Sequence, residues 1–358
     1  MDKRTAFAAG FKRNSIVVLI IALLVSPSIL MFIEWTVVSG KYTIIPEPYL
    51  LGNQNNDYLH VSYQMFNLKP NRPETMPVYI TGGSSIREGI ESDEDLSEKI
   101  SERYNVDTEV YQFASSKQTM AETLSIIDNL PGGKGIVIVG VNYNNMLGSD
   151  KSQNYAQLKG DKLLLKSTHL RDALNRYAGE AVTYYTILPG ILNQTLAYSG
   201  KYLIKNTLKH KSIKVQYLLH RYNKPLTFEE RKTNVEQLKA ILSVAEDETA
   251  RLNIYLAKEI IKLGRSKGFD IIFVDTPINK DGIGSQLDDV NRFYRTTMRN
   301  ITTEDDVLYC DFIWDMQIEN TEFADLAHLI TKGARDAFQE RLVDGIRPSF
   351  VRFEKGGL

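Results

Sequence analysis

Short apolar runs alternate with amphipathic segments along most of the chain beyond residue 76. The apolar runs predict strands over residues 78–81, 108–113, 135–141, 269–275 and 307–312. Apolar positions at three- and four-residue spacing predict helices over residues 93–104, 119–129, 232–263, 286–298 and 331–342. This alternation predicts an α/β fold, a three-layer α/β/α sandwich around a parallel sheet.

An apolar run over residues 15–38 contains a single charged residue, Glu34. A membrane-spanning helix needs about 20 such residues, so we expect a transmembrane anchor. Four basic residues precede it: Lys3, Arg4, Lys12 and Arg13. By the positive-inside rule, residues 1–14 are a cytoplasmic tail, and the rest of the chain is extracytoplasmic, either periplasmic or at the cell surface. A cleaved signal peptide and a buried core helix are the alternatives.

The remaining chain divides by composition. Residues 39–76 are rich in proline and predict a stalk and loop leading from the membrane to the domain. We assign the two halves of the core to residues 77–145 and 232–358, separated by a mostly helical insertion over 146–231. Five lysines of the insertion form either a solvated helix face or a contact for anionic lipid or polymer: Lys201, Lys205, Lys209, Lys211 and Lys214.

Composition narrows the function only slightly. The 358 residues are 43% hydrophobic and 24% charged, which is normal for a globular core. A net charge of -1 gives no reason to expect nucleic acid as a partner. The single cysteine, Cys310, excludes a disulfide within the chain and is expected to be a small buried residue. We expect neither a cofactor nor a metal.

The first stretch with candidate chemistry is Gly82-Gly83-Ser84-Ser85, between the first predicted strand and an acid-rich helix pattern. A serine at the start of a helix lies among unpaired backbone N–H groups and at the positive end of the helix dipole. That position favours an anion, and it suits a nucleophilic serine whose acyl chemistry forms an oxyanion. A Gly-Ser turn with a serine N-cap is the alternative.

The second candidate stretch holds Asp325 and His328, between the last predicted strand and the last helix. At this spacing the two side chains can point the same way. The carboxylate can then hold one imidazole tautomer and leave the other ring nitrogen to accept a serine proton. Loops beyond the carboxyl ends of parallel strands are where such sheets place their sites. A helix-cap aspartate beside a partly buried histidine is the alternative.

Taken together, four short blocks resemble the SGNH/GDSL hydrolase superfamily over about residues 76–145 and 268–345. They are Thr81-Gly82-Gly83-Ser84, residues 113–119, Val139-Gly140-Val141-Asn142, and Asp325-x-x-His328. The resemblance implies that Ser84 is the nucleophile, His328 the general base and Asp325 its orienter. It also implies an oxyanion hole made by the Ser84 N–H, a backbone N–H near Lys117 and the Asn142 side chain.

Three residues depart from the family pattern. Gly83 replaces the usual aspartate of the first block, Lys117 stands where the second usually has glycine, and Tyr143 follows Asn142 where aspartate is usual. Ser85 remains an alternative nucleophile, because Gly83-Ser84-Ser85 fits the first block in a shifted register.

Membrane-anchored proteins that look like this include O-acetyltransferases of exported polysaccharides and the D-alanyl transfer protein of teichoic acid assembly. By that analogy we expect an extracytoplasmic serine O-acyltransferase of a cell-envelope polysaccharide, working beside a multi-spanning membrane O-acyltransferase. Two alternatives stay open. One is an esterase or lipase acting on acyl esters, with the tyrosine-rich insertion as its lid. The other is a non-catalytic scaffold that partners a membrane acyltransferase.

Overall fold

A computed structural model of the chain describes residues 3–44, 57–68, 75–148, 151–179, 186–194, 220, 222, 224–242, 247–312 and 316–354. Five parallel strands form one sheet in the order β2-β1-β3-β4-β5. They are β1 Met76–Gly82, β2 Thr108–Gln112, β3 Gly135–Val141, β4 Phe269–Asp275 and β5 Leu308–Cys310. The chain runs from β1 to one edge and then crosses back to β3. The carboxyl ends of β1 and β3 therefore form a topological switch point, where open α/β sheets bind ligands.

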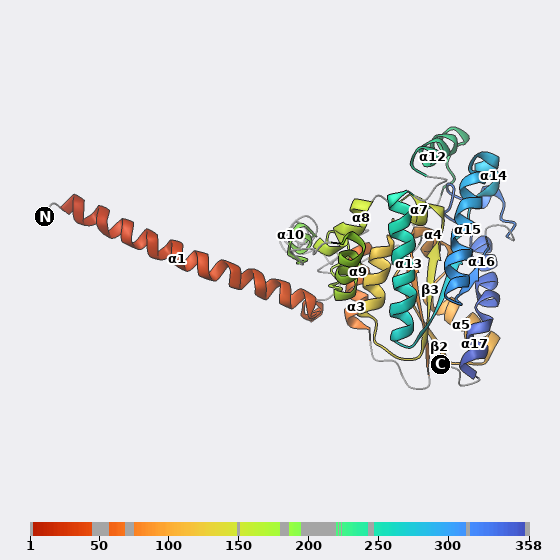
Figure 1. Cartoon of the computed structure of the whole chain (residues 1–358), viewed down its shortest axis with the longest axis horizontal. Helices are drawn as coiled ribbons and strands as arrows, with labels where there is room; N and C mark the ends of the chain where they lie inside the picture. The colour runs from red at the N-terminus through yellow and green to blue at the C-terminus, as the bar shows by residue number, and fades with distance from the viewer. Residues whose placement is uncertain are drawn as a thin grey trace, which may run out of the picture.

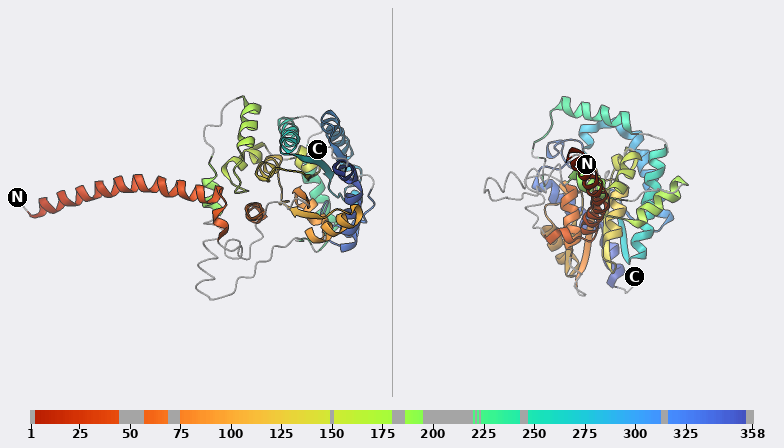
Figure 2. Two further views of the ribbon diagram at one scale, coloured as in Figure 1. Left: turned by 90° about the horizontal axis from the view of Figure 1, so that it is seen from below. Right: turned by 90° about the vertical axis from the view of Figure 1, so that its left-hand side faces the viewer.

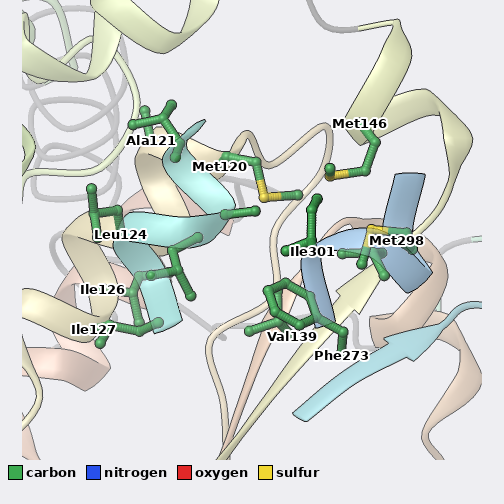
Figure 3. Packing of buried hydrophobic residues seen from close by; sticks show 14 of the residues in the cluster. Met120, Ala121, Leu124, Ile126, Ile127, Val139, Met146, Phe273, Met298 and Ile301 are labelled. Atoms are coloured by element: carbon green, nitrogen blue, oxygen red, sulfur yellow. The ribbon is translucent and has the colours of Figure 1, made fainter. Parts of the chain in front are cut away.

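The central strands β1, β3 and β4 are buried on both faces, and their alternating side chains supply two separate cores. Tyr79, Val137 and Ile271 enter one core together with α6 Met120–Asn129, α13 Glu248–Ser266 and α15 Asp288–Glu304. Val78, Ile136 and Ile272 enter the other, with α5 Asp93–Tyr104, α16 Lys332–Gly345 and α17 Arg347–Glu354. Figure 3 shows Met120, Met298, Val139 and Phe273 of the first core in one cluster. The predicted three-layer sandwich is confirmed.

Most predicted core elements appear close to their expected bounds. β3, β4 and α5 match, and Cys310 is buried at the end of β5. The single helix expected over residues 232–263 is wrong, because α12 Phe228–Ile241 and α13 are separate helices. The Asp247 side chain accepts a hydrogen bond from Ala250 N and so begins α13 with an N-cap. Apolar spacing continues across this break, which hides it from a periodicity argument.

The N-terminal helix α1 Lys3–Val38 projects away from the α/β body (Figures 1 and 2). Within it, Val17–Val38 is long and apolar enough to cross a membrane, and its most apolar window is not buried inside the protein. The buried-core-helix alternative is therefore wrong. An anchor and a signal sequence both fit this helix.

The region expected to be a stalk contains helical structure that packs on the body. It forms η1 Lys41–Ile44 and α3 Asp57–Asn67. Val61 and Met65 of α3 belong to the first core, because the apolar face of this short helix covers the sheet's flank.

Among the described residues of the insertion, the regular structure is helical. Its elements are α8 Lys151–Ala156, η2 Gln157–Lys159, α9 Thr168–Ala178 and α10 Leu188–Gln194. Ile187 and Ile191 pack in one cluster with Val37 of α1. The basic cluster Lys201, Lys205, Lys209, Lys211 and Lys214 lies outside the described residues.

The remaining short elements gather around the loops. They are α4 Ser84–Gly89, α7 Tyr143–Leu147, α14 Lys280–Ile283, η4 Gly284–Leu287 and η5 Asn320–Glu322. Figure 1 shows α4, α7, α12 and α14 at the end of the sheet toward which the strand arrows point. This end carries the candidate site.

Candidate active site

Two glycines on neighbouring strands bring α4 onto the rim of the sheet. Gly82 pairs with Gly140, and a Cβ on Gly82, whose φ is 137°, would lie 2.5 Å from the Gly140 carbonyl oxygen. A Cβ on Gly140 would lie 2.7 Å from Ile86 of α4. Larger residues would push the helix away. The close approach places Ser84, the first residue of α4, at the switch point between β1 and β3.

Ser84, His328 and Asp325 form a continuous hydrogen-bonded chain. Ser84 Oγ lies 2.8 Å from His328 Nε2. On the other side of the ring, His328 Nδ1 lies 2.9 Å from Asp325 Oδ1 and 2.7 Å from Oδ2. The carboxylate requires a proton on Nδ1, so the neutral imidazole presents an unprotonated Nε2 to the serine hydroxyl. The structure thus brings together the two distant stretches from which the triad was predicted.

A tight loop holds the aspartate and the histidine in this arrangement. Phe323 and Leu329 form an antiparallel bridge, and Ala324 N donates to the His328 carbonyl oxygen at 2.8 Å. Inside the loop, Asp325 Oδ1 accepts from the backbone N–H groups of Ala327 and His328 at 2.9 and 3.0 Å. Burial alone would raise the Asp325 pKa, but the hydrogen bonds and charge of His328 and the two backbone donors hold it below its ordinary value. Asp325 therefore remains an ionised orienter.

Tyr222, near the end of the insertion, covers one face of the His328 ring. The Tyr222 ring stacks on the His328 imidazole, with 3.9 Å between centroids and 12° between planes. His220 Nε2 lies 2.8 Å from the Ile90 carbonyl oxygen, just beyond α4. Stacking adds packing contacts that hold the imidazole plane, and it shields one face of the ring from water. Sequence analysis counted Tyr222 only among the tyrosines of the insertion and did not consider His220, because no spacing links either residue to the motif blocks.

Asn142 is fixed so that its amide nitrogen can serve as a donor. Its Oδ1 accepts from Asn144 N and Asn145 N at 2.9 and 3.1 Å and so caps α7. This orients the amide group, and Nδ2 donates to Thr276 Oγ1 at 3.1 Å. Nδ2 carries two hydrogens, so one remains for the pocket that Asn142 lines. This geometry suits the expected oxyanion role.

Lys117 adopts the backbone conformation that glycine takes most easily. Its φ is 53°, and Gln118 N donates to the Ser115 carbonyl oxygen at 3.3 Å, which closes a turn around Ser116 and Lys117. The departure from glycine at this position therefore keeps a left-handed backbone. Among the described residues, the Lys117 N–H has no hydrogen-bond partner, and Lys117 lines the pocket.

Ser85 also lines the pocket, but Ser84 makes the hydrogen bond to the imidazole. Gly83 lies beside α7, since a Cβ there would meet Asn145 Nδ2 at 3.3 Å. Gln118 is a site residue that sequence analysis did not single out, although it lies in the second block. Its Oε1 accepts from Gly82 N and Ser115 N at 3.3 and 3.0 Å, and its Nε2 donates to Thr81 Oγ1 at 2.6 Å. It ties the turn before Lys117 to the end of β1.

These residues open into a pocket of about 450 Å³. Side-chain amides make up much of its wall: Gln118, Asn142, Asn144, Asn145, Gln153, Asn234 and Gln237. Leu238, Ile241, Ile278 and Leu326 supply apolar surface. The described residues contain no cluster of His, Cys, Asp and Glu that could hold a metal ion. The arrangement can activate a serine beside a polar surface made largely of amides, with Lys117 as its cationic residue.

No family model and no curated protein matches this sequence. Among solved structures, the chain is similar to TesA, with 10% identity, a TM-score of 0.32, and coverage of 76% of this chain and 98% of that one. It is also similar to the lipase Lip_vut3 from a goat rumen metagenome, with 10% identity, a TM-score of 0.33, and coverage of 75% and 97%. We draw no function from likenesses this distant.

Proposed function

We propose that the protein is a membrane-anchored serine acyl-transfer enzyme of the SGNH/GDSL type that acts outside the cytoplasm. It transfers an acyl group, such as acetyl, to a hydroxyl of a cell-surface or exported polysaccharide. The observation that carries this proposal is the chain of hydrogen bonds from Ser84 through His328 to Asp325. Such a chain converts a weak hydroxyl nucleophile into a reactive one.

The reaction has two steps, acylation of Ser84 and transfer of the acyl group to the acceptor. Ser84 Oγ attacks the donor's acyl carbonyl while His328 Nε2 takes its proton, and the imidazolium returns that proton to the leaving group. The acceptor hydroxyl then attacks the acyl-serine, His328 takes the acceptor's proton, and the proton returns to Ser84 Oγ. In both tetrahedral states, the oxyanion accepts from the backbone N–H groups of Ser84 and Lys117 and from Asn142 Nδ2.

The side-chain amides of the pocket favour a carbohydrate acceptor. Amide side chains offer both donors and acceptors, which matches sugar hydroxyls, and they impose no charge on the substrate. Asn234 and Gln237 of α12 and Asn144 of α7 all line the pocket. The acidic member of the lining, Asp325, is already engaged by His328. Lys117 is the cationic member of the lining, so the amides argue for an acceptor rich in hydroxyl groups, such as a stretch of glycan, and not for one of a particular charge.

The length and hydropathy of α1 support membrane attachment. We propose that a multi-spanning membrane O-acyltransferase supplies the acyl donor, because a glycan-modifying domain tethered outside the cytoplasm needs an acyl group delivered across the membrane.

An acyl-ester hydrolase is the second candidate, and the apolar part of the pocket favours it. Leu238 and Ile241 of α12 line the pocket, and the Ile241 side chain is 56% exposed. Such a surface can hold an acyl chain. The two candidates differ in whether a glycan hydroxyl or water attacks the acyl-serine.

Turnover of p-nitrophenyl acetate by the full-length protein in detergent micelles distinguishes them. For a transferase, p-nitrophenol release rises with added neutral oligosaccharide, and acetyl groups appear on the sugar. A rate of p-nitrophenol release that does not change with added sugar, with acetate as the only other product, indicates a hydrolase. No release, together with no labelling of Ser84 by a fluorophosphonate, would support the non-catalytic scaffold instead.

A further inference from the structure

The first two residues of α3 bind the N–H, the hydroxyl and the carbonyl oxygen of Ser116, the residue that precedes Lys117. Asp57 Oδ2 accepts from Ser116 N at 2.9 Å and from Ser116 Oγ at 2.7 Å. Tyr58 OH donates to the Ser116 carbonyl oxygen at 2.6 Å. Arg87 of α4 binds the same Asp57 oxygen at 2.5 Å, and both side chains are buried. The helix after the membrane-proximal region is thus joined to the candidate oxyanion hole.

The bond from Tyr58 acts on one particular peptide unit. The Ser116 carbonyl and the Lys117 N–H belong to the same peptide, which is trans, so the two groups point in opposite directions. Because the carbonyl is directed at the Tyr58 hydroxyl of α3, the N–H is directed away from α3. Ser116 and Lys117 both line the pocket, so an N–H directed away from α3 can act there as an oxyanion donor.

The turn has an alternative state in which this donor is lost. A positive φ at the third residue is the type II pattern, which favours glycine there, whereas a type I turn has a negative φ at that residue. The two types differ by a rotation of the central peptide, here the one joining Ser116 to Lys117. A lysine at φ 53° is disfavoured by its Cβ, so this sequence on its own favours type I. Contacts from outside the turn must hold the observed state.

Lys162 supplies a further external contact to the turn, besides those of Asp57 and Tyr58. Its Nζ donates to the Lys117 carbonyl oxygen at 3.1 Å and lies 5.7 Å from the centroid of the Tyr58 ring. This contact acts on the peptide after Lys117. Among the described residues, the Tyr58 hydroxyl is the group that binds the carbonyl oxygen of the central peptide.

We propose that Tyr58 is a positioning residue for the oxyanion hole: its hydroxyl locks the peptide between Ser116 and Lys117 in the orientation that aims the Lys117 N–H into the pocket. This inference rests on the proposed function, since it needs an oxyanion to stabilise. Because Tyr58 belongs to α3, the rate of acyl transfer then depends on how α3 packs against this turn. This hydrogen bond also explains how a lysine can occupy a position where glycine is usual.

Steady-state kinetics of full-length Tyr58→Phe test the proposal, because this change removes the hydroxyl and keeps the ring. We expect kcat for p-nitrophenyl acetate to fall about 10- to 100-fold, with KM within about twofold, since the lost donor acts on the transition state. Adding Lys117→Gly to Tyr58→Phe restores most of kcat, because glycine takes a positive φ without a steric cost.

Tyr63→Phe is the matched control on the same helix. Its hydroxyl donates to the Thr43 carbonyl oxygen at 3.4 Å, away from the turn, so kcat stays at the wild-type value. The proposal is overturned if Tyr58→Phe keeps the wild-type kcat, if Lys117→Gly does not restore it, or if Tyr63→Phe loses as much. A wild-type protein that neither turns over nor reacts with a fluorophosphonate shows instead that the proposed function has failed.

Discussion

Ser84 Oγ and His328 Nε2 lie 2.8 Å apart, although 244 positions separate the two residues in the chain. The sheet makes this meeting possible. Ser84 follows β1, and His328 lies in the loop beyond β5, so both lie past the carboxyl ends of parallel strands. A hydroxyl placed against an imidazole that is itself oriented by a carboxylate is the arrangement that serine acyl chemistry needs.

Removing either end of this contact should abolish acyl transfer without unfolding the protein. We expect Ser84→Ala and His328→Ala each to lower kcat about 10⁴- to 10⁶-fold, because neither the nucleophile nor its base can be replaced by the other. The midpoint of thermal unfolding should stay near the wild-type value, since both side chains lie at the rim of the sheet. Steady-state turnover of p-nitrophenyl acetate measures the loss in kcat.

Ser85→Ala is the control for that pair. It removes a hydroxyl of the same kind one position along α4, and kcat should stay within a fewfold of wild type. The opposite pattern, with activity kept in Ser84→Ala and lost in Ser85→Ala, would move the nucleophile to Ser85. Wild-type activity in both variants would show that neither serine is the nucleophile and would end the triad interpretation.

Asn142→Asp separates the capping role of this residue from its role as a donor. Aspartate keeps the side-chain oxygen that caps α7 but has no N–H to offer an oxyanion. We expect kcat to fall about 10²- to 10³-fold, the usual loss for an oxyanion donor, with little change in the unfolding midpoint. A variant that keeps the wild-type kcat would remove Asn142 from the oxyanion hole.

The pocket-facing amides of α12 should affect the acceptor and not the acyl donor. Asn234→Leu and Gln237→Leu are expected to raise KM for a neutral oligosaccharide about tenfold each, because each leaves sugar hydroxyls unpaired. Hydrolysis of p-nitrophenyl acetate without sugar should stay unchanged. Lys239→Leu, an exposed residue of the same helix outside the pocket lining, is the control. Equal effects in all three variants would argue against an acceptor site on α12.

Folding stability should fall as the pH rises from about 5 to about 8. Burial raises the pKa of Asp275 to about 8, although the hydroxyls of Tyr294 and Tyr309 donate to it. Burial likewise raises the pKa of Asp93 to about 7. An acid whose folded pKa exceeds its unfolded value binds more protons in the folded state, so its contribution is present at low pH and is lost through this window.

Asp275→Asn checks that assignment, because the amide resembles the protonated acid. The variant should show a smaller drop in unfolding midpoint than wild type between about pH 5 and pH 8. Circular dichroism of the full-length protein in detergent measures both midpoints. An unchanged slope would show that Asp275 does not titrate in this window.

Much of the core could be predicted from local patterns. β3 and β4 are apolar throughout because both faces of the central strands are buried, and this makes their bounds visible in the sequence. Thr119 and Thr331 mark their helix starts through side-chain caps. Ser84, Asp325 and His328 could be proposed together because each lies in a short block directly after a strand or before a helix.

The other parts depend on contacts that no local pattern records. Tyr58 reaches Ser116 across 58 positions, and nothing around either residue predicts the pairing. Tyr222 stacks on His328 from an insertion without a recognisable motif. The break between α12 and α13 was hidden for a different reason, since apolar spacing continues through it and only the Asp247 cap marks the new start.

Mass mapping of a fluorophosphonate adduct on the full-length protein tests the central claim most directly. The account predicts one adduct per chain, on the peptide that contains Ser84, absent from Ser84→Ala and formed far more slowly in His328→Ala. No adduct on the wild-type protein, or one that persists undiminished in Ser84→Ala, would contradict it.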